Sequence, residues 1–287
     1  VSDGWTDIIR KLLVRVQADD TPDISPDGLA KTMELADFEK MEEIRARVDA
    51  IVADPVTAEA LKPYYRQFCK RPCFHDEYLD TFNRPNVALV DTKGRGVERI
   101  TEHGVVANGV EYELDCLIYA TGFEVGTNYT RRSGYELYGR GGVTLTEKWA
   151  NGVATLHGMQ SRGFPNCFII SNAQSGFTVN FPHMLNEQGK HLAYIIKHAL
   201  DHEIRMMEPS DQAERAWVET IINLSRNGQE FLESCTPGYY NNEGKPGEQG
   251  GQNGTFFGRA QNGPYGGGPI AFVKLLEDWR AEGTLQG

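Results

Sequence analysis

The stretch Asp115-Cys116-Leu117-Ile118-Tyr119-Ala120-Thr121-Gly122-Phe123 decides the fold, because its apolar run is unbroken and ends in Thr-Gly. Such a run is typical of a parallel strand buried on both faces that stops at a ligand-facing loop. A second buried strand is predicted at 166–171, with a polar loop at 172–180 and a helix from about His183 to His202. This order of strand, loop and helix predicts an α/β fold with a candidate anion site at the start of the helix.

Outward from these strands, the periodicity of the apolar residues predicts mostly helices. Pro63 should end one helical stretch because proline lacks a backbone N–H, and Asn108-Gly109 has the turn chemistry of a hairpin. The predicted elements are helices at 26–54 and from 55 to Pro63, strands at 86–91 and 97–101, a hairpin of 104–107 and 110–114, and helices at 210–232 and 270–281, the last one ended by Gly283.

The composition indicates a globular protein and excludes several classes of function. The 287 residues are 40% hydrophobic, and 29 Lys and Arg against 40 Asp and Glu leave a net charge of −11. The basic surface of a nucleic-acid binder is therefore missing. No apolar run approaches the roughly 18 residues of a membrane-spanning helix, and the first residues lack the order of a signal peptide. The odd number of cysteines favours a reducing compartment, so we expect a cytoplasmic protein without nucleic-acid or membrane partners.

Few motifs in the sequence indicate a binding site or a catalytic site by themselves. No GxGxxG string is present, so a dinucleotide site cannot be predicted from a fingerprint. Cys69 and Cys73 lack a second ligand pair at zinc-site spacing, and no metal site is predicted. Taken alone, the adjacent cations Lys70 and Arg71 are typical of a solvated surface. Three histidines have no Ser or Cys partner in a nucleophile motif: His157, His183 and His191.

Several strings, taken in order along the chain, resemble one known family. Lys70-Arg71-Pro72 is followed by Tyr78-Leu79-Asp80-Thr81-Phe82-Asn83-Arg84-Pro85-Asn86-Val87 and then by Leu-Ile-Tyr-Ala-Thr-Gly-Phe at 117–123. Glu147-Lys148-Trp149, Gly163-Phe164-Pro165-Asn166 and Glu187-Gln188 follow. From about residue 60 to 250, the chain resembles the second half of flavin-dependent Baeyer–Villiger monooxygenases, which are class B flavoprotein monooxygenases.

The resemblance implies parts of two Rossmann-like dinucleotide-binding domains, one for FAD and one for NADPH, with helical insertions. It assigns residues 1–60 to a helical insertion, 61–123 to the C-terminal part of the NADPH-binding domain and 124–165 to a linker. Residues 166–287 become the returning part of the FAD domain, with a C-terminal loop and helices. The two fingerprints of the family lie in its N-terminal half. That half of the same polypeptide is therefore an expected partner, in agreement with Val rather than Met as the first residue.

The resemblance also implies roles for individual residues. Arg71 matches the active-site arginine beside the flavin, where a guanidinium stabilises an anionic intermediate. Lys70 matches the lysine that approaches the 2′-phosphate of NADPH. Further cofactor contacts are implied for Thr121, Gly122 and Phe123 at the strand end, and for Asn180, Phe181 and Pro182 at the start of a flavin-contacting helix.

The implied reaction is the conversion of a ketone into an ester or lactone by way of a flavin peroxide, with FAD, NADPH and oxygen. One departure concerns the loop before Gly244-Lys245-Pro246, where many family members carry a tryptophan. Tyr239 or Tyr240 would take its place by stacking. Two alternatives stay open: a related flavin monooxygenase that oxidises amine or sulfide heteroatoms, and an incomplete, non-catalytic fragment.

Overall fold

The computed structural model describes residues 26–122, 129–178, 180–225, 229–238, 240, 241, 244 and 260–285, together with 4, 6, 7, 10, 11 and 14. The chain divides into two compact units, Val1–Phe123 and Glu124–Gly287, and each is described by itself.

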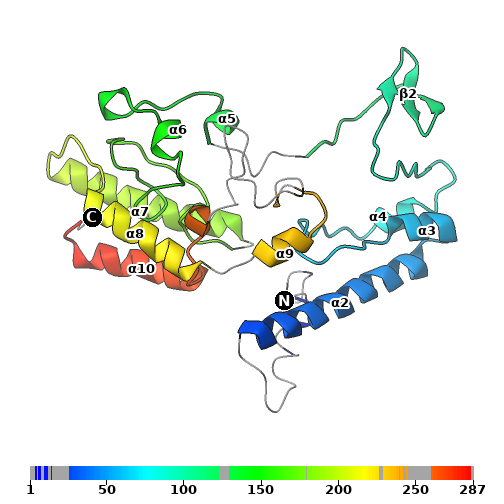
Figure 1. Ribbon diagram of the computed structural model, residues 1–287, viewed down its shortest axis with the longest axis horizontal. Helices are drawn as coiled ribbons and strands as arrows, with labels where there is room; N and C mark the ends of the chain where they lie inside the picture. The colour runs from blue at the N-terminus through cyan, green and yellow to red at the C-terminus, as the bar shows by residue number, and fades with distance from the viewer. Residues whose placement is uncertain are drawn as a thin grey trace. The chain divides into compact units, whose positions relative to one another are not determined.

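Helices dominate both units (Figure 1). The described helices are α2 (Pro26–Ile51), α3 (Pro55–Leu61), α4 (Tyr78–Thr81), α5 (Tyr129–Ser133), α6 (Leu145–Lys148), α7 (Phe181–Asp201), α8 (Asp211–Leu224), α9 (Gln229–Ser234) and α10 (Pro269–Glu282), with the 3-10 turns η1 (Arg140–Gly142) and η3 (Ala260–Asn262). The described strands are β1 (Arg99–Ile100), β2 (Gly104–Ala107) and β3 (Val110–Glu113).

The helices of the first unit confirm the predictions for this part of the chain. The long helix α2 is followed directly by α3, which ends at Leu61, two residues before Pro63. Asn83, from the string that resembles the monooxygenase family, accepts a hydrogen bond from the backbone N–H of Ala53 (2.8 Å) and donates one to the carbonyl of Ile51 (2.7 Å). These bonds satisfy backbone groups at the end of α2, which would otherwise lack helical partners.

The predicted hairpin is confirmed as an antiparallel sheet of order β1-β2-β3. Asn108 and Gly109 both have positive φ, 54° and 74°, as the two central residues of a type I′ turn require. Val106 and Ala107 of β2 are buried. The hairpin therefore forms from local pairing and needs no distant strand.

The prediction of strands outside the hairpin is wrong for the described residues. The predicted strands at 86–91, 115–123 and 166–171 have no strand pairing among the described residues. Ile118 is 83% exposed and Tyr119 is 68% exposed, although the prediction buried both. The apolar pattern identifies a strand that needs neighbours on two sides, and the described residues supply no neighbour.

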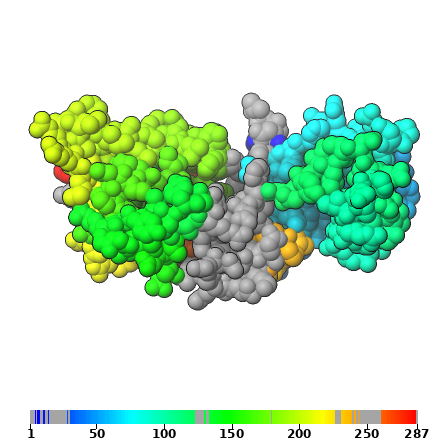
Figure 2. Space-filling view, turned by 90° about the horizontal axis from the view of Figure 1, so that it is seen from above, coloured from blue at the N-terminus to red at the C-terminus, as the bar shows by residue number. Residues whose placement is uncertain are grey.

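The described residues of the second unit form two hydrophobic clusters. The larger cluster joins Met184 and Leu192 of α7, Trp217 and Ile221 of α8, and Phe272 of α10, so these three helices pack together (Figure 1). The smaller cluster, centred on Leu145, Phe164 and Ile169, includes part of the predicted linker. Figure 2 shows the predicted linker, in green, beside the yellow-green α7 on one face of this unit.

Local signals fix the ends of the helices in this unit. The predicted helices at 183–202 and 270–281 appear as α7 and α10, and Gly283 ends α10 in the left-handed conformation. Ser210 caps α8 as predicted by accepting a hydrogen bond from the N–H of Ala213 (3.1 Å). The predicted continuation to Leu232 is wrong, because Ser225 adopts extended backbone and ends the helix at Leu224.

Candidate functional site

A cationic loop after α3 carries Lys70 and Arg71 in the first unit. The loop is tied to α2 by Asp37, which accepts hydrogen bonds from Arg66 Nε (3.1 Å) and from the N–H of Gln67 (2.7 Å). The ammonium of Lys70 lies 5.7 Å from the ring centre of Tyr65, a cation–π contact. Arg71 is exposed to solvent. A guanidinium in this position is free to meet an anionic ligand.

The predicted contacts at the strand end are also in the first unit. Thr121 and Gly122 are exposed, and Gly122 has a φ of 81°, which only glycine adopts readily. Phe123 lies outside the described residues. Exposed backbone after an unpaired apolar stretch is available for contact with further chain or with a ligand.

The start of α7 presents the second predicted set of contacts. The side chain of Asn180 accepts a hydrogen bond from the N–H of His183 (3.2 Å), so Asn180 caps the helix. Phe181 and Pro182 form the first helical positions, and Phe181 is exposed. The positive end of the helix dipole therefore lies at the predicted flavin-contacting position.

Two buried oxygen atoms of the second unit have no hydrogen-bond donor among the described residues: Asn172 Oδ1, in the chain before α7, and Gln188 Oε1, within α7. Buried acceptors are nearly always paired in complete structures. A ligand with N–H or O–H donors, such as a flavin ring, therefore fits the chemistry of this part of the chain.

The described start of the loop after α9 is held together by a residue that the sequence interpretation missed. Asn241, which is 2% exposed, accepts hydrogen bonds from the N–H groups of Gly238 (3.0 Å) and Gly244 (3.1 Å). Its amide also donates to the carbonyls of Leu232, Cys235 and Thr236. Tyr240 beside it is half-buried, whereas Tyr239 lies outside the described residues. An Asn among turn-forming residues was the available signal.

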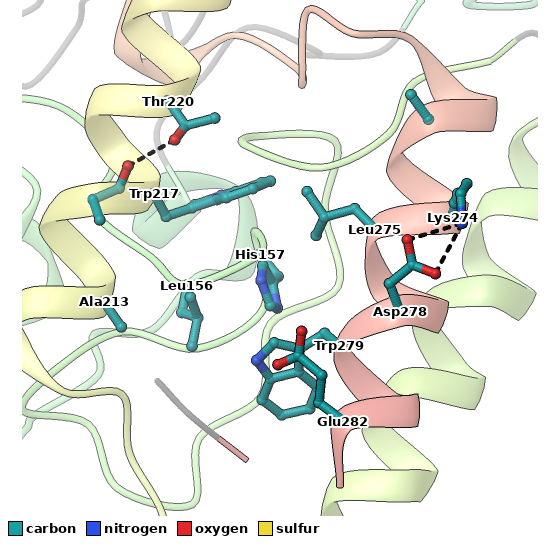
Figure 3. Close-up of a pocket in the computed structure, with 12 residues that line it drawn as sticks. Leu156, His157, Ala213, Trp217, Thr220, Lys274, Leu275, Asp278, Trp279 and Glu282 are labelled. Atoms are coloured by element: carbon teal, nitrogen blue, oxygen red, sulfur yellow. Dashed lines mark hydrogen bonds and ion pairs between the residues drawn. The ribbon is translucent and has the colours of Figure 1, made fainter. Parts of the chain in front are cut away.

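A groove of about 660 Å³ lies between α8 and α10, with His157 in its lining (Figure 3). Figure 3 shows His157 between Trp217 of α8 and Trp279 of α10. The walls are largely apolar, and the exposed ion pair of Lys274 and Asp278 lies on the α10 side.

His157 contacts a second buried histidine behind the groove. His157 Nδ1 lies 3.4 Å from His191 Nε2. Burial lowers the pKa of His157 to about 4. Burial, followed by the positive charges of His157 and Arg280, lowers the pKa of His191 to about 3. Both imidazoles are therefore neutral at pH 7.

The described residues contain no group of three or more His, Cys, Asp or Glu side chains placed to hold a metal ion. None of the helices within the described ranges is long and apolar enough to cross a membrane. The predicted site residues are divided between the two units. Lys70, Arg71, Thr121 and Gly122 belong to the first unit, and Asn180, Phe181, Pro182 and Tyr240 belong to the second.

The comparisons with solved structures define the class as a flavoprotein monooxygenase. Polycyclic ketone monooxygenase from Thermothelomyces thermophila superposes with a TM-score of 0.84 at 37% identity, over 100% of this chain and 46% of that chain. The structure of OTEMO in complex with FAD and NADP matches with a TM-score of 0.65 at 25% identity, over 87% of this chain and 44% of that chain. The α/β class is thus supported.

The sequence relatives give the family. Neopentalenolactone D synthase of Streptomyces avermitilis is 55% identical over 287 residues, which are 99% of this chain and 47% of that protein. Baeyer-Villiger monooxygenase ATR8 of Stachybotrys chlorohalonatus is 44% identical over 287 residues, 100% of this chain and 45% of that protein. No family model matches the chain. The chain belongs to the Baeyer–Villiger monooxygenases and spans about half the length of the relatives it matches.

Proposed function

We propose that the complete protein containing this chain is a Baeyer–Villiger monooxygenase that uses FAD, NADPH and oxygen to convert a ketone into an ester or lactone. The observation that carries the proposal is the match of the whole chain to proteins of this family. The solved complex with FAD and NADP supports the two cofactors. The family name also favours a ketone over an amine or sulfide substrate, and a polycyclic ketone is the first substrate to test.

Under this proposal, the two units complete two Rossmann-like domains together with the other half of the polypeptide. Residues 61–123 complete the NADPH-binding domain, and residues 166–287 complete the FAD domain. The cofactors would supply the electron transfer and the activation of oxygen. The residues of this chain bind and orient the cofactors and stabilise charge.

The start of α7 would hold part of the FAD. The capped helix end at Asn180, Phe181 and Pro182 offers a positive dipole end to an electron-rich group. Thr121, Gly122 and Phe123 would contact cofactor where the first unit ends, and the absence of a side chain at Gly122 permits close backbone approach. Tyr239 or Tyr240 would stack on the nicotinamide cofactor, since an aromatic ring offers a flat apolar face.

The two cations after α3 would bind different groups. Arg71 is the proposed catalytic residue, because an exposed guanidinium is always charged and stabilises negative charge that develops during oxygen transfer. Lys70 would contact the 2′-phosphate of NADPH as a point charge. Its position over the Tyr65 ring, 5.7 Å from the ring centre, restrains the long side chain before the cofactor arrives.

The proposal is tested by replacing Arg71 in the complete enzyme. Arg71→Ala should still bind FAD and oxidise NADPH, while ester formation falls by about 10²- to 10³-fold, because the lost charge acts mainly on the transition state. The measurement compares product formation with NADPH consumption at saturating ketone. Unchanged ester yield would remove Arg71 from the mechanism.

Lys70→Ala is the matched control, since it removes the neighbouring positive charge. This variant should raise the KM for NADPH by about tenfold and leave the KM for NADH nearly unchanged. If both variants lower the use of both cofactors equally, the loop has lost its fold and neither role is supported.

A further inference from the structure

Gln188 lies two turns inside α7 and is almost fully buried, with 1% of its surface exposed. Its amide nitrogen donates to the carbonyl of Ser171 (2.8 Å) and to Ser175 Oγ (2.9 Å). Ser175 Oγ in turn donates to the same carbonyl of Ser171 (2.6 Å). A side chain within the helix therefore fixes both ends of the loop 171–175, which leads into the start of that helix.

The opposite side of this loop is held by backbone contacts. The N–H of Gln174 donates to the carbonyl of Gly263 (2.8 Å), and the N–H of Tyr265 donates to the carbonyl of Ser175 (2.9 Å). At Gly176 a Cβ atom would lie 2.5 Å from Met184 Cε and 2.8 Å from Phe272 Cδ1, so a larger residue there would require these two side chains to move. The loop is thus confined on several sides, and Gln188 supplies its side-chain link to α7.

The amide oxygen of Gln188 is buried and has no donor among the described residues. A structural glutamine in a closed core would normally use its oxygen as well as its nitrogen. This oxygen can therefore accept one further hydrogen bond.

We propose that Gln188 is a positioning residue that fixes the loop 171–176 and thereby sets the direction in which the start of α7 meets the flavin. This inference rests on the proposed function, because it assigns the start of α7 to FAD. Gln188 does not touch the reacting atoms. It acts through the loop, whose two serines it binds, and the loop carries the chain to Asn180.

The test replaces Gln188 by methionine in the complete, FAD-loaded enzyme. Methionine has a similar size and helix propensity but cannot donate to Ser171 or Ser175. FAD affinity, measured by flavin fluorescence, should fall by about tenfold or more. The visible absorbance of bound flavin should shift, and amide hydrogen exchange should accelerate within residues 171–178 while the α8 amides stay protected.

Gln160→Met is the matched control. Gln160 is also a buried glutamine of the second unit, 8% exposed, and its side chain makes no hydrogen bond to this loop among the described residues. This variant should leave FAD affinity within about twofold and the flavin spectrum unchanged. Ser175→Ala is a milder second variant for the case that Gln188→Met does not fold. It should loosen the loop and lower FAD affinity about threefold.

The outcomes of these experiments distinguish the proposed function from the role of Gln188. A complete enzyme that binds no flavin refutes the proposed function together with this inference. An enzyme that binds flavin, but in which Gln188→Met matches Gln160→Met in affinity, spectrum and loop exchange, overturns the role of Gln188 alone. If Gln188→Met does not fold, normal affinity in Ser175→Ala overturns it.

Discussion

At the scale of single residues, the buried histidine pair links the stability of the second unit to pH. The pKa values of His157 and His191, about 4 and about 3, lie below the ordinary value of 6.5, mainly because burial disfavours the charged imidazole. Between about pH 6.5 and pH 3 the unfolded chain therefore binds more protons than the folded chain. Stability is complete above pH 6.5 and is lost as the pH falls through this window.

We expect His191→Gln to reduce this pH dependence, since glutamine stays neutral at every pH. Each histidine contributes a slope of at most about 1.4 kcal/mol per pH unit. The measurement is the difference in unfolding temperature between the variant and the parent enzyme from pH 7.5 to pH 5. Relative to the parent, the variant should gain stability as the pH falls. His202→Gln is the control, because His202 is exposed. Parallel curves for all three proteins would contradict the linkage.

At the scale of elements, α6 and α8 are joined through a buried carboxylate. Glu214 of α8 is buried and accepts hydrogen bonds from Lys148 Nζ (2.7 Å) and from the N–H of Arg162 (2.6 Å). Lys148 belongs to the Glu-Lys-Trp string that resembles the family, so this string has a structural role. The neighbouring Trp149 supports the same region by donating to the carbonyl of Ala154 (3.1 Å).

Lys148→Met should destabilise the folded protein by roughly 2–3 kcal/mol, because the buried Glu214 carboxylate loses its counter-charge. Lys274→Met removes the same type of side chain from an ion pair whose partners are 72% and 60% exposed. The control should cost at most about 0.5 kcal/mol. Denaturant unfolding of the two variants measures the difference. Equal losses would show that Lys148 contributes no more than a surface lysine.

Whether an element could be predicted from the sequence depends on whether its signals lie within the element itself. Helices such as α7 and α10, and the Asn108-Gly109 hairpin, are specified by caps, periodicity and turn residues that lie within the element. The stretches at 116–122 and 167–170 have the composition of buried strands but no pairing among the described residues. A parallel strand depends on neighbours that a local pattern cannot supply.

The candidate site was predictable to a different degree. Lys70 and Arg71 could be selected as candidates because a family string contains them, and Asn180 because the resemblance assigns it to the start of a flavin-contacting helix. Gln188 also lies in such a string, but its contacts with Ser171 and Ser175 join residues 13 and 17 positions apart. Periodicity reports which face of a helix is buried and does not report the partner of a buried amide. The hydrogen bonds of Gln188 and Asn241 therefore become visible only in the folded structure.

At the scale of the whole molecule, the chain exposes apolar surface that a complete monooxygenase should bury. Leu117, Ile118 and Tyr119 are 39%, 83% and 68% exposed, and the relatives are about twice as long as this chain. Unpaired apolar strands favour association with other chains. We expect residues 1–287 alone to be colourless, prone to aggregate and unable to oxidise NADPH, whereas the complete enzyme binds FAD and is active.

A lysine introduced at position 118 should have opposite effects in the isolated chain and in the complete enzyme. In the isolated chain, Ile118→Lys should reduce aggregation, since a lysine on an exposed strand opposes edge pairing. In the complete enzyme, the same change buries a charge in the sheet and should abolish folding or FAD binding.

Ile270→Lys is the control, because Ile270 is 86% exposed and lies in the first turn of α10. Size-exclusion chromatography and flavin absorbance measure both effects. Stoichiometric FAD in residues 1–287, or a fully active Ile118→Lys enzyme, would refute the assignment of 116–122 to a sheet completed by the other half.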